Sequence, residues 1–268
     1  MWDKNDVEKV HLRYCRYFLG IGNKSSNIAC RGELGRFPLK IFTDKLTIKY
    51  FNHLICLPDD TLAKQSLFLS ISLFKKNKSC YISNFQKMLN YHDPSFTFSI
   101  ERIIDNTSIN KLEHCMKNNY FELWKNQLKH SSKLAFYETF KEFYEEEKYL
   151  NVITNFEQRQ QFTKFRISNH KLAIETGRYT KPITPRDKRL CSLCNNDTAV
   201  ETELHLIFEC PSYSKIRSDF HSKIKDKITF SPNHVTSLMK SVDETVIIYL
   251  SIFIWKCFQS RKEKLPDM

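Results

Sequence analysis

The sequence predicts a mainly α-helical protein with a multi-helix N-terminal region, a small zinc-binding module of the Cys-Cys-His-Cys type and C-terminal helices. Glycine (5) and proline (8) are scarce among the 268 residues, whereas an all-β chain needs turn residues about every ten positions. Apolar residues recur at helical spacing along most of the chain. Three cysteines and one histidine also fall between positions 191 and 210, which indicates a metal-stabilised module.

The N-terminal region reads as successive helices. Asp6 can cap the first helix, in which Val7, Val10, Tyr14 and Phe18 form an apolar stripe. Pro38 suits the first turn of another helix, whose stripe is Leu39, Phe42, Leu46, Tyr50 and Leu54. The remaining helices are predicted over 25–35, 61–76, 81–91, 108–117 and 120–144.

The charge pattern changes near Leu150, and we therefore predict two regions, 1–150 and 151–268. Residues 151–190 hold nine Lys or Arg against three acidic residues, whereas 191–210 hold four acidic residues and no Lys or Arg. A basic arm thus precedes a small acidic module. Helices are predicted over 213–228 and 246–258, and the second is apolar enough to pack in a core.

The overall charge and the cysteine usage limit the functional class. A formal charge of +12 favours polyanionic partners such as nucleic acid. The longest nearly apolar run, 246–255, is too short to span a bilayer, so we expect no membrane association. Nine cysteines, an odd number, and a start without an apolar signal segment disfavour a secreted disulfide framework. We expect an intracellular protein.

The cysteine-histidine cluster has the spacing C-x2-C-x10-H-x4-C. The x2 spacing of Cys191 and Cys194 allows one tight turn to direct two sulfurs at one ion, and His205 and Cys210 lie on a predicted short helix. Three thiolates and one imidazole form a closed structural Zn²⁺ site without an open catalytic position. Two alternatives are reduced cysteines with an unrelated histidine and a redox Cys-x-x-Cys motif. The redox motif usually occurs in a βαβ context, which this sequence does not predict.

Several blocks resemble the region that follows the polymerase in LINE-type (non-LTR) retrotransposon reverse transcriptases. These blocks are 32–39 (GELGRFPL), 165–179 (FRISNHKLAIETGRY), 189–194 (RLCSLC) and 203–211 (ELHLIFECP). The resemblance implies a C-terminal piece of a polyprotein that helps to hold RNA or target DNA. It carries over only the four zinc ligands, Cys191, Cys194, His205 and Cys210.

The sequence departs from this family in its catalytic residues. The Tyr/Phe-x-Asp-Asp signature that holds two metal ions in a polymerase is absent. Asp59 and Asp60 follow Pro58 between two helical patterns and read as a helix-capping loop. No restriction-type nuclease set of carboxylates and lysine follows Cys210. We therefore expect no enzymatic activity.

The basic arm is the predicted nucleic-acid contact, with cationic groups for phosphates and rings for stacking on bases. Its candidate residues are Arg166, His170, Lys171, Arg178, Tyr179, Lys181, Arg186, Lys188 and Arg189. A solvated surface paired with the acids of the module is the alternative reading of these residues.

Together these features predict a non-catalytic, zinc-stabilised fragment of a retrotransposon reverse transcriptase that binds RNA or single-stranded DNA. The polymerase portion of a related element is a second predicted partner. The alternative is a structural or protein-interaction remnant with no nucleic-acid binding of its own.

Overall fold

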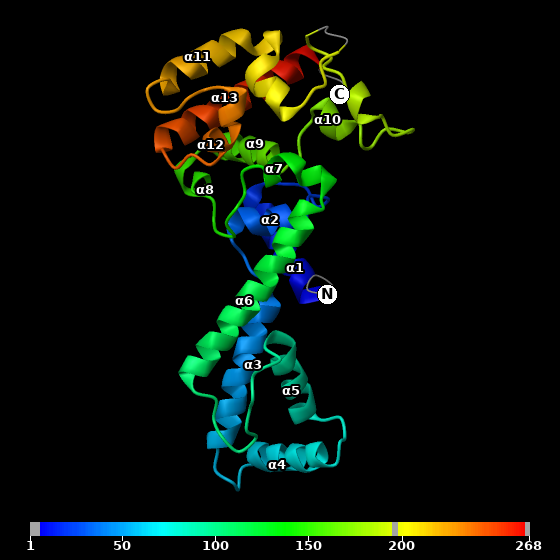
Figure 1. Cartoon of the computed structure of the whole chain (residues 1–268), viewed down its shortest axis with the longest axis vertical. Helices are drawn as coiled ribbons and strands as arrows, with labels where there is room; N and C mark the ends of the chain where they lie inside the picture. The colour runs from blue at the N-terminus through cyan, green and yellow to red at the C-terminus, as the bar shows by residue number, and fades with distance from the viewer. Residues whose placement is uncertain (1–5, 195–197, 266–268) are drawn as a thin grey trace. The chain divides into compact units, whose positions relative to one another are not determined.

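The computed structural model describes residues 6–194 and 198–265. These residues are mainly helical, as the sequence predicts (Figure 1). The α-helices are α1 (Asp6–Leu19), α2 (Asn27–Leu34), α3 (Leu39–Cys56), α4 (Leu62–Lys75), α5 (Tyr81–His92), α6 (Asn106–Lys129), α7 (Ala135–Glu138), α8 (Tyr149–Val152), α9 (Phe156–Arg166), α10 (Ala173–Thr176), α11 (Ser214–Ile224), α12 (Val235–Met239) and α13 (Glu244–Lys264). Short 3₁₀ turns cover Ser132–Leu134, Arg186–Lys188, Pro211–Tyr213 and Pro232–His234, and a π-helical turn, η3, covers His205–Glu209.

One predicted helix is wrong in its bounds. The patterns over 108–117 and 120–144 are joined in α6, which ends at Lys129 instead of continuing to residue 144. A 3₁₀ turn and the short α7 follow it. The change of direction allows Leu134 and Tyr137 to be fully buried, because it turns both side chains into a core. Burial of these two residues therefore outweighs the local preference for continued helix.

The chain forms two compact units. Unit 1 contains residues 1–11 and 37–125, and unit 2 contains residues 12–36 and 126–268. The predicted boundary near Leu150 does not coincide with this division, because Leu150 is a buried residue inside unit 2. The chain passes from one unit to the other three times, within the helices α1 and α6 and between residues 36 and 37, in the loop that joins α2 to α3. Two of the three crossings lie inside continuous helices, where no linker composition marks them.

Aromatic packing and a side-chain clamp hold unit 1 together. The rings of Phe51 in α3 and Phe85 in α5 are stacked with centroids 4.7 Å apart, and Phe98 meets both rings edge-on. Asn52 donates to the carbonyl of Ile104 at 2.6 Å and accepts from its amide at 2.8 Å. The Asn52 side chain thus satisfies both backbone polar groups of Ile104, as a neighbouring backbone would, and anchors the segment that leads to α6.

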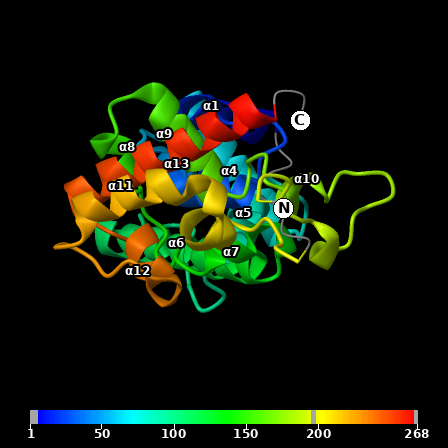
Figure 2. The same cartoon turned by 90° about the horizontal axis from the view of Figure 1, so that it is seen from above.

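Helix α13 is the centre of unit 2. It packs against α8, α9 and α11, and both views show it between α9 and α11 (Figure 1, Figure 2). Phe253 stacks on Phe220 of α11 with centroids 4.9 Å apart. Val246, Leu250 and Ile254 are also buried, so the apolar helix predicted over 246–258 is confirmed as a core helix.

A buried ion-pair network joins distant segments of unit 2. The guanidinium of Arg166 donates to both carboxylate oxygens of Glu33, at 2.9 and 3.2 Å. It also lies 2.7 Å from Glu147 and donates to the carbonyl of Met239 at 2.8 Å. Burial disfavours the charged guanidinium, but the two carboxylates outweigh this effect and raise the pKa of Arg166.

Two helices expose the apolar stripes that sequence spacing assigned to them. In α1, Val7, Tyr14 and Phe18 are exposed, and in α3, Phe42, Leu46 and Tyr50 are exposed. Leu54 is the member of the predicted α3 stripe that is buried, and the other buried residues are Leu12, Cys15 and Leu19 in α1, and Ile41, Ile48 and Phe51 in α3. Each helix carries apolar residues on two faces, and the packing of the fold decides which of the two faces is buried.

A search of the described residues finds no helix that combines the length and apolarity needed to cross a membrane.

We predict that Arg166→Ala lowers the free energy of unfolding by about 3–5 kcal/mol, because it leaves the buried Glu33 carboxylate without its partner. Urea denaturation followed by circular dichroism measures the change. Arg186→Ala, which removes an exposed arginine of the same unit, serves as the control and should change stability by about 0.5 kcal/mol or less. Equal effects of the two substitutions would contradict a structural role for the network.

Candidate metal centre and basic loop

A short backbone pairing presents the first two cysteines. Leu190 and Val200 form an isolated antiparallel bridge, and the amide of Cys191 donates to the carbonyl of Ala199 at 2.9 Å. The hydroxyl of Ser212 donates to the carbonyl of Leu193 at 2.8 Å. These bonds hold the Cys-x-x-Cys turn against the segment that carries the other two ligands.

The second pair of ligands lies at the two ends of η3. Thr202 accepts a hydrogen bond from the amide of His205 at 3.0 Å and so stabilises the start of this turn. The amide of Cys210 donates to the carbonyl of His205 at 2.8 Å. The wider π-helical turn brings these two residues, five positions apart, to the same side.

The structure brings all four predicted ligands together. The Sγ atoms of Cys191, Cys194 and Cys210 and a ring nitrogen of His205 all lie within 4.8 Å of one another. Cys191 Sγ and Cys210 Sγ are 3.9 Å apart, and Cys194 Sγ lies 3.6 Å from His205 Nε2. A tetrahedral Zn²⁺ with ordinary bond lengths requires about 3.8 Å between two sulfurs and about 3.6 Å between sulfur and nitrogen. The residues therefore fit a metal ion of this kind.

A carboxylate orients the imidazole. His205 Nδ1 lies 3.2 Å from Glu209 Oε2. Because a carboxylate accepts, this contact places the ring proton on Nδ1 and leaves Nε2, the nitrogen nearest Cys194, with its lone pair toward the cluster.

Two thiols of the cluster, those of Cys191 and Cys210, are in hydrogen-bond contact. The hydrogen bond from Cys191 lowers the pKa of the Cys210 thiol to about 7, although burial opposes this shift. The same contact, together with burial, raises the pKa of Cys191. Cys210 is consequently the thiol that ionises most easily of this pair.

A second carboxylate connects the cluster to the core. Glu201 Oε1 lies 3.7 Å from Cys191 Sγ and forms an ion pair with Arg261 of α13. Its Oε2 accepts from the amide of Ala173, the first residue of α10, at 2.6 Å. Burial raises the pKa of Glu201 despite the nearby guanidinium. One side chain thus ties the cluster to both α10 and α13.

Arg217 of α11 satisfies the carbonyls that η3 leaves free. It donates to the carbonyls of Ile207 at 2.7 Å, Cys210 at 2.8 Å and Leu206 at 3.3 Å. The carbonyls of Leu206 and Ile207 belong to η3, whose last carbonyls lack partners within the turn, whereas the carbonyl of Cys210 also accepts from the amide of Tyr213. The guanidinium of Arg217 therefore holds the segment that carries His205 and Cys210 against α11.

The predicted nucleic-acid residues divide into buried and exposed groups. Arg166, His170 and Arg189 are buried. Arg166 is held by the ion-pair network, and Arg189 donates to the carbonyls of Ile174 and Thr184. The burial of these three residues corrects their predicted role, because a buried side chain with protein partners cannot meet a phosphate. The exposed members are Lys171, Tyr179, Lys181, Arg186 and Lys188, and Arg178 is half-buried.

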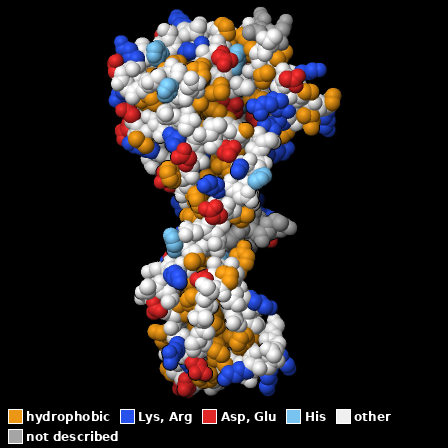
Figure 3. Space-filling model, viewed as in Figure 1, with side chains coloured by type: hydrophobic (Ala, Val, Ile, Leu, Met, Phe, Trp, Pro, Cys, Tyr) orange, Lys and Arg blue, Asp and Glu red, His pale blue; other side chains and the backbone are white. Residues whose placement is uncertain are grey.

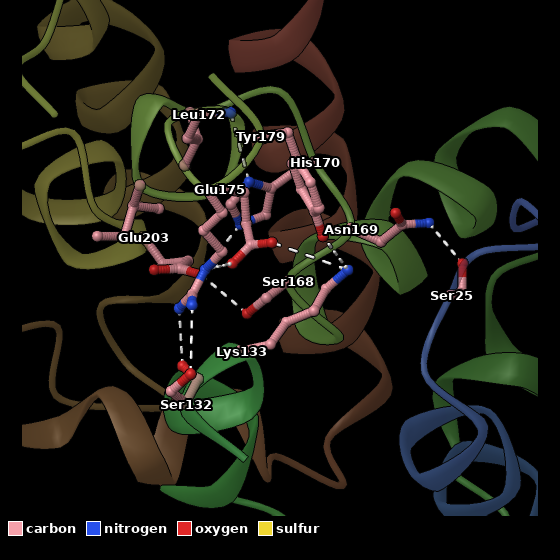
Figure 4. Close-up of polar contacts among 12 residues, drawn as sticks. Ser25, Ser132, Lys133, Ser168, Asn169, His170, Leu172, Glu175, Tyr179 and Glu203 are labelled. Carbon is pink, nitrogen blue, oxygen red and sulfur yellow. Dashed lines mark hydrogen bonds and ion pairs between the residues drawn. The ribbon is translucent and has the colours of Figure 1, made fainter. Parts of the chain in front are cut away.

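Figure 4 shows how His170 is retained in the interior. His170 Nε2 and Ser168 Oγ both contact Glu203 Oε1, at 3.0 and 3.1 Å. Burial opposes ionisation of Glu203, but the hydrogen bond from His170 holds its pKa below the ordinary value. The carboxylate lies between the serine and the histidine, which is not the order of a serine-histidine-acid triad. This arrangement suits a structural clamp.

A second set of polar contacts holds the start of the segment that follows α10 (Figure 4). Arg178 donates to Glu175 at 2.6 Å and to the carbonyl of Ser132 at 2.7 Å. Lys133 donates to the hydroxyl of Tyr179 at 3.1 Å and lies over its ring. The ring of Tyr179 nonetheless remains 68% exposed, so its outer face is open to a ligand.

Figure 3 shows Lys and Arg side chains gathered over α10 and the loop that follows it. The exposed cations of this segment are Lys181, Arg186 and Lys188, and we call residues 178–188 the basic loop. Asp187 is the acidic residue within it. The loop also exposes Ile183.

The sequence did not single out three residues that support the cluster. Glu209 lies four positions after His205, a spacing at which helical side chains meet, and this signal could have revealed it. Arg217 lies seven residues after Cys210, but no local pattern marks it, and Arg261 is distant from the cysteines in sequence.

Comparisons with protein-family models, curated proteins and solved structures yield no match to this chain.

We predict that Glu209→Gln weakens binding of Zn²⁺ about tenfold, because the imidazole loses the carboxylate that orients it. Competition with a chromophoric chelator measures the affinity. Glu263→Gln on α13 removes an exposed carboxylate and serves as the control. An unchanged affinity in Glu209→Gln would contradict the orienting role.

Proposed function

We propose that this protein is a non-catalytic nucleic-acid-binding fragment whose Cys191, Cys194, His205 and Cys210 hold one structural Zn²⁺ ion. The observation that carries the proposal is the convergence of four ligand atoms within 4.8 Å of one another. Zinc is favoured over harder cations because three sulfurs and one imidazole nitrogen are its preferred ligands.

The structural role follows from the closure of the site. Four protein ligands complete a tetrahedron, and three of them are buried, so no position is left for a catalytic water. Bound Zn²⁺ would neutralise the thiolate charges and add its binding energy to folding. That contribution matters here because the described residues between Cys191 and Cys210 contain little regular structure of their own.

The basic loop is the proposed contact with single-stranded RNA or DNA. It places Lys181, Arg186 and Lys188 in solvent beside the open face of Tyr179. Cations neutralise phosphates, and an exposed ring stacks on an unpaired base without sequence preference. Lys171 is also exposed, but it precedes α10 and lies outside the basic loop.

The resemblance to LINE-type reverse transcriptases supports the same interpretation. We propose that the chain derives from the region following the polymerase in such an element, with the polymerase portion of a related element as a protein partner. The ligand spacing and the block over 165–179 are the parts of the sequence that support this origin.

Purified protein should contain one Zn²⁺ per chain, measured by native mass spectrometry and elemental analysis. Cys191→Ser should lose most of the metal and unfold at lower urea concentration, because it removes a buried ligand. Cys56→Ser, at an exposed cysteine of unit 1, should retain both metal and stability. Metal-free wild-type protein of unchanged stability would contradict a structural zinc site.

Binding to a single-stranded 20-nucleotide RNA should weaken about fifty-fold between 50 and 200 mM salt, as expected for about four phosphate contacts. Fluorescence anisotropy measures this dependence. Replacing Lys181, Arg186 and Lys188 together by Gln should reduce the slope of this salt dependence by about three quarters, because it removes three of about four phosphate contacts. The control replaces Lys75, Lys76 and Lys78 of unit 1, which are also exposed, and carries the same charge change. Equal losses in the two variants would show that binding is not located at the basic loop.

The alternative of a protein-interaction remnant has its own supporting observation. Phe42, Leu46 and Tyr50 form an exposed apolar stripe on α3, and contiguous exposed apolar surface often marks a protein interface. Zinc-loaded protein that binds neither RNA nor single-stranded DNA at 50 mM salt would favour this function.

A further inference from the structure

A separate cavity in unit 2 has the composition of an anion site. It has a volume of about 360 Å³, within the usual range for small-ligand pockets. Gln161 of α9, Lys171 of the following loop, and Phe258, Gln259, Arg261 and Lys262 of α13 line it. We call it the α9–α13 cavity.

The charge of this cavity is one-sided. Three of its lining residues are cations, and none of the described residues that line it is a carboxylate. Arg261 is paired with Glu201, which lies outside the lining and beside the metal cluster. Lys171 and Lys262 are exposed. Their charges therefore remain available to a ligand, whereas that of Arg261 is largely compensated.

A second cavity makes the contrast clear. Lys133, Arg178 and Arg186 line it, but so do Glu175 and Glu203. Glu175 already engages Lys133 and Arg178. The positive charges of that cavity are thus largely compensated by its own carboxylates, and a bound anion would gain little electrostatic attraction there.

The other lining groups of the α9–α13 cavity suit a nucleobase. Phe258 is half-buried, and its ring is positioned by Phe165 at 6.3 Å and His170 at 6.1 Å between centroids. An aromatic ring held in this way offers a surface on which a base can stack. The amides of Gln161 and Gln259 each supply donors and an acceptor, as a base edge requires.

We propose that the α9–α13 cavity binds one phosphorylated nucleotide unit, with the phosphate at Lys171 and Lys262 and the base on Phe258. This inference rests on the proposed nucleic-acid binding and assigns it a second contact, distinct from the basic loop. The nucleotide is either free or the 5′-terminal unit of a strand, and both sources present the same phosphate and base.

Arg261 gives the cavity a connection to the metal centre. Arg261 forms part of the cavity wall, and its partner Glu201 contacts Cys191. The wall is thus held by the same carboxylate that touches a metal ligand. The test therefore uses the zinc-loaded full chain.

The probe is a single-stranded trinucleotide with a 5′-phosphate and a 3′-fluorescein, titrated by anisotropy. Lys262→Gln should weaken its binding about tenfold, as expected for loss of one charge-assisted hydrogen bond. Phe258→Leu should weaken binding about fivefold or more through lost stacking. Lys264→Gln, with an exposed lysine on the same helix outside the lining, should bind within about twofold of wild type. Lys262 is exposed, so Lys262→Gln should leave the fold intact. It therefore tests the proposal even if Phe258→Leu destabilises the protein.

Competition distinguishes the sources of the ligand. A mononucleotide that displaces the probe at the same concentration as an unlabelled phosphorylated trinucleotide identifies a free nucleotide, and stronger displacement by the trinucleotide identifies a strand end. Inorganic phosphate that displaces the probe as well as either would overturn the assignment of the base to Phe258.

The outcome also separates this inference from the proposed function. Normal binding of the 20-nucleotide RNA, together with a trinucleotide affinity that Lys262→Gln leaves unchanged, overturns the cavity assignment alone. Absence of binding to both probes overturns both proposals.

Discussion

The carboxylate of Glu201 joins the parts of unit 2 that carry its candidate functions. It contacts Cys191, pairs with Arg261 of α13 and accepts the amide that begins α10. Its backbone also pairs with Arg189 on one side and Ile174 on the other. A buried carboxylate is costly unless its charge is compensated and its oxygens are hydrogen-bonded. Here both conditions hold, so the cluster, the base of the basic loop and the core helix are held in one arrangement.

The charge balance around the cluster depends on the same residue pair. When Cys191 is a thiolate, it stands next to the Glu201 carboxylate, and the two negative charges repel. Arg261 offsets this repulsion from α13, and Arg217 caps the carbonyls on the α11 side. Three thiolates in this mostly buried setting would therefore rely on cations from two helices, α11, which closely follows Cys210, and α13, which is distant in the sequence.

The basic excess of the chain serves two different purposes. Arg166 and Arg189 are interior cations that join segments by ion pairs or carbonyl contacts. Lys181, Arg186 and Lys188 remain in solvent. The positive charge of residues 151–190 is thus only partly surface charge, and the surface that a polyanion meets is smaller than the composition indicates. This division also explains why the exposed cations concentrate on one loop.

The sequence alone was sufficient for the features that depend on local spacing. Scarce glycine and helical periodicity predicted a mainly helical chain, and α4, α5 and α13 lie where that periodicity places them. The spacing of Cys191, Cys194, His205 and Cys210 identified a set of ligand atoms that the fold brings together. Local spacing suffices for these because helix geometry and a tight Cys-x-x-Cys turn are set by neighbouring residues.

Only the tertiary structure decided which faces are buried and which charges are free. The stripes of α1 and α3 were ambiguous because each helix has two apolar faces, and the long-range packing of Leu12, Ile48 and Phe51 selected one. The two crossings between units that lie inside α1 and α6 leave no mark in composition. The pairings of Arg166 with Glu33 and of Arg261 with Glu201 span 133 and 60 residues. Such contacts depend on the closure of long loops, and no short-range pattern in a single sequence encodes them.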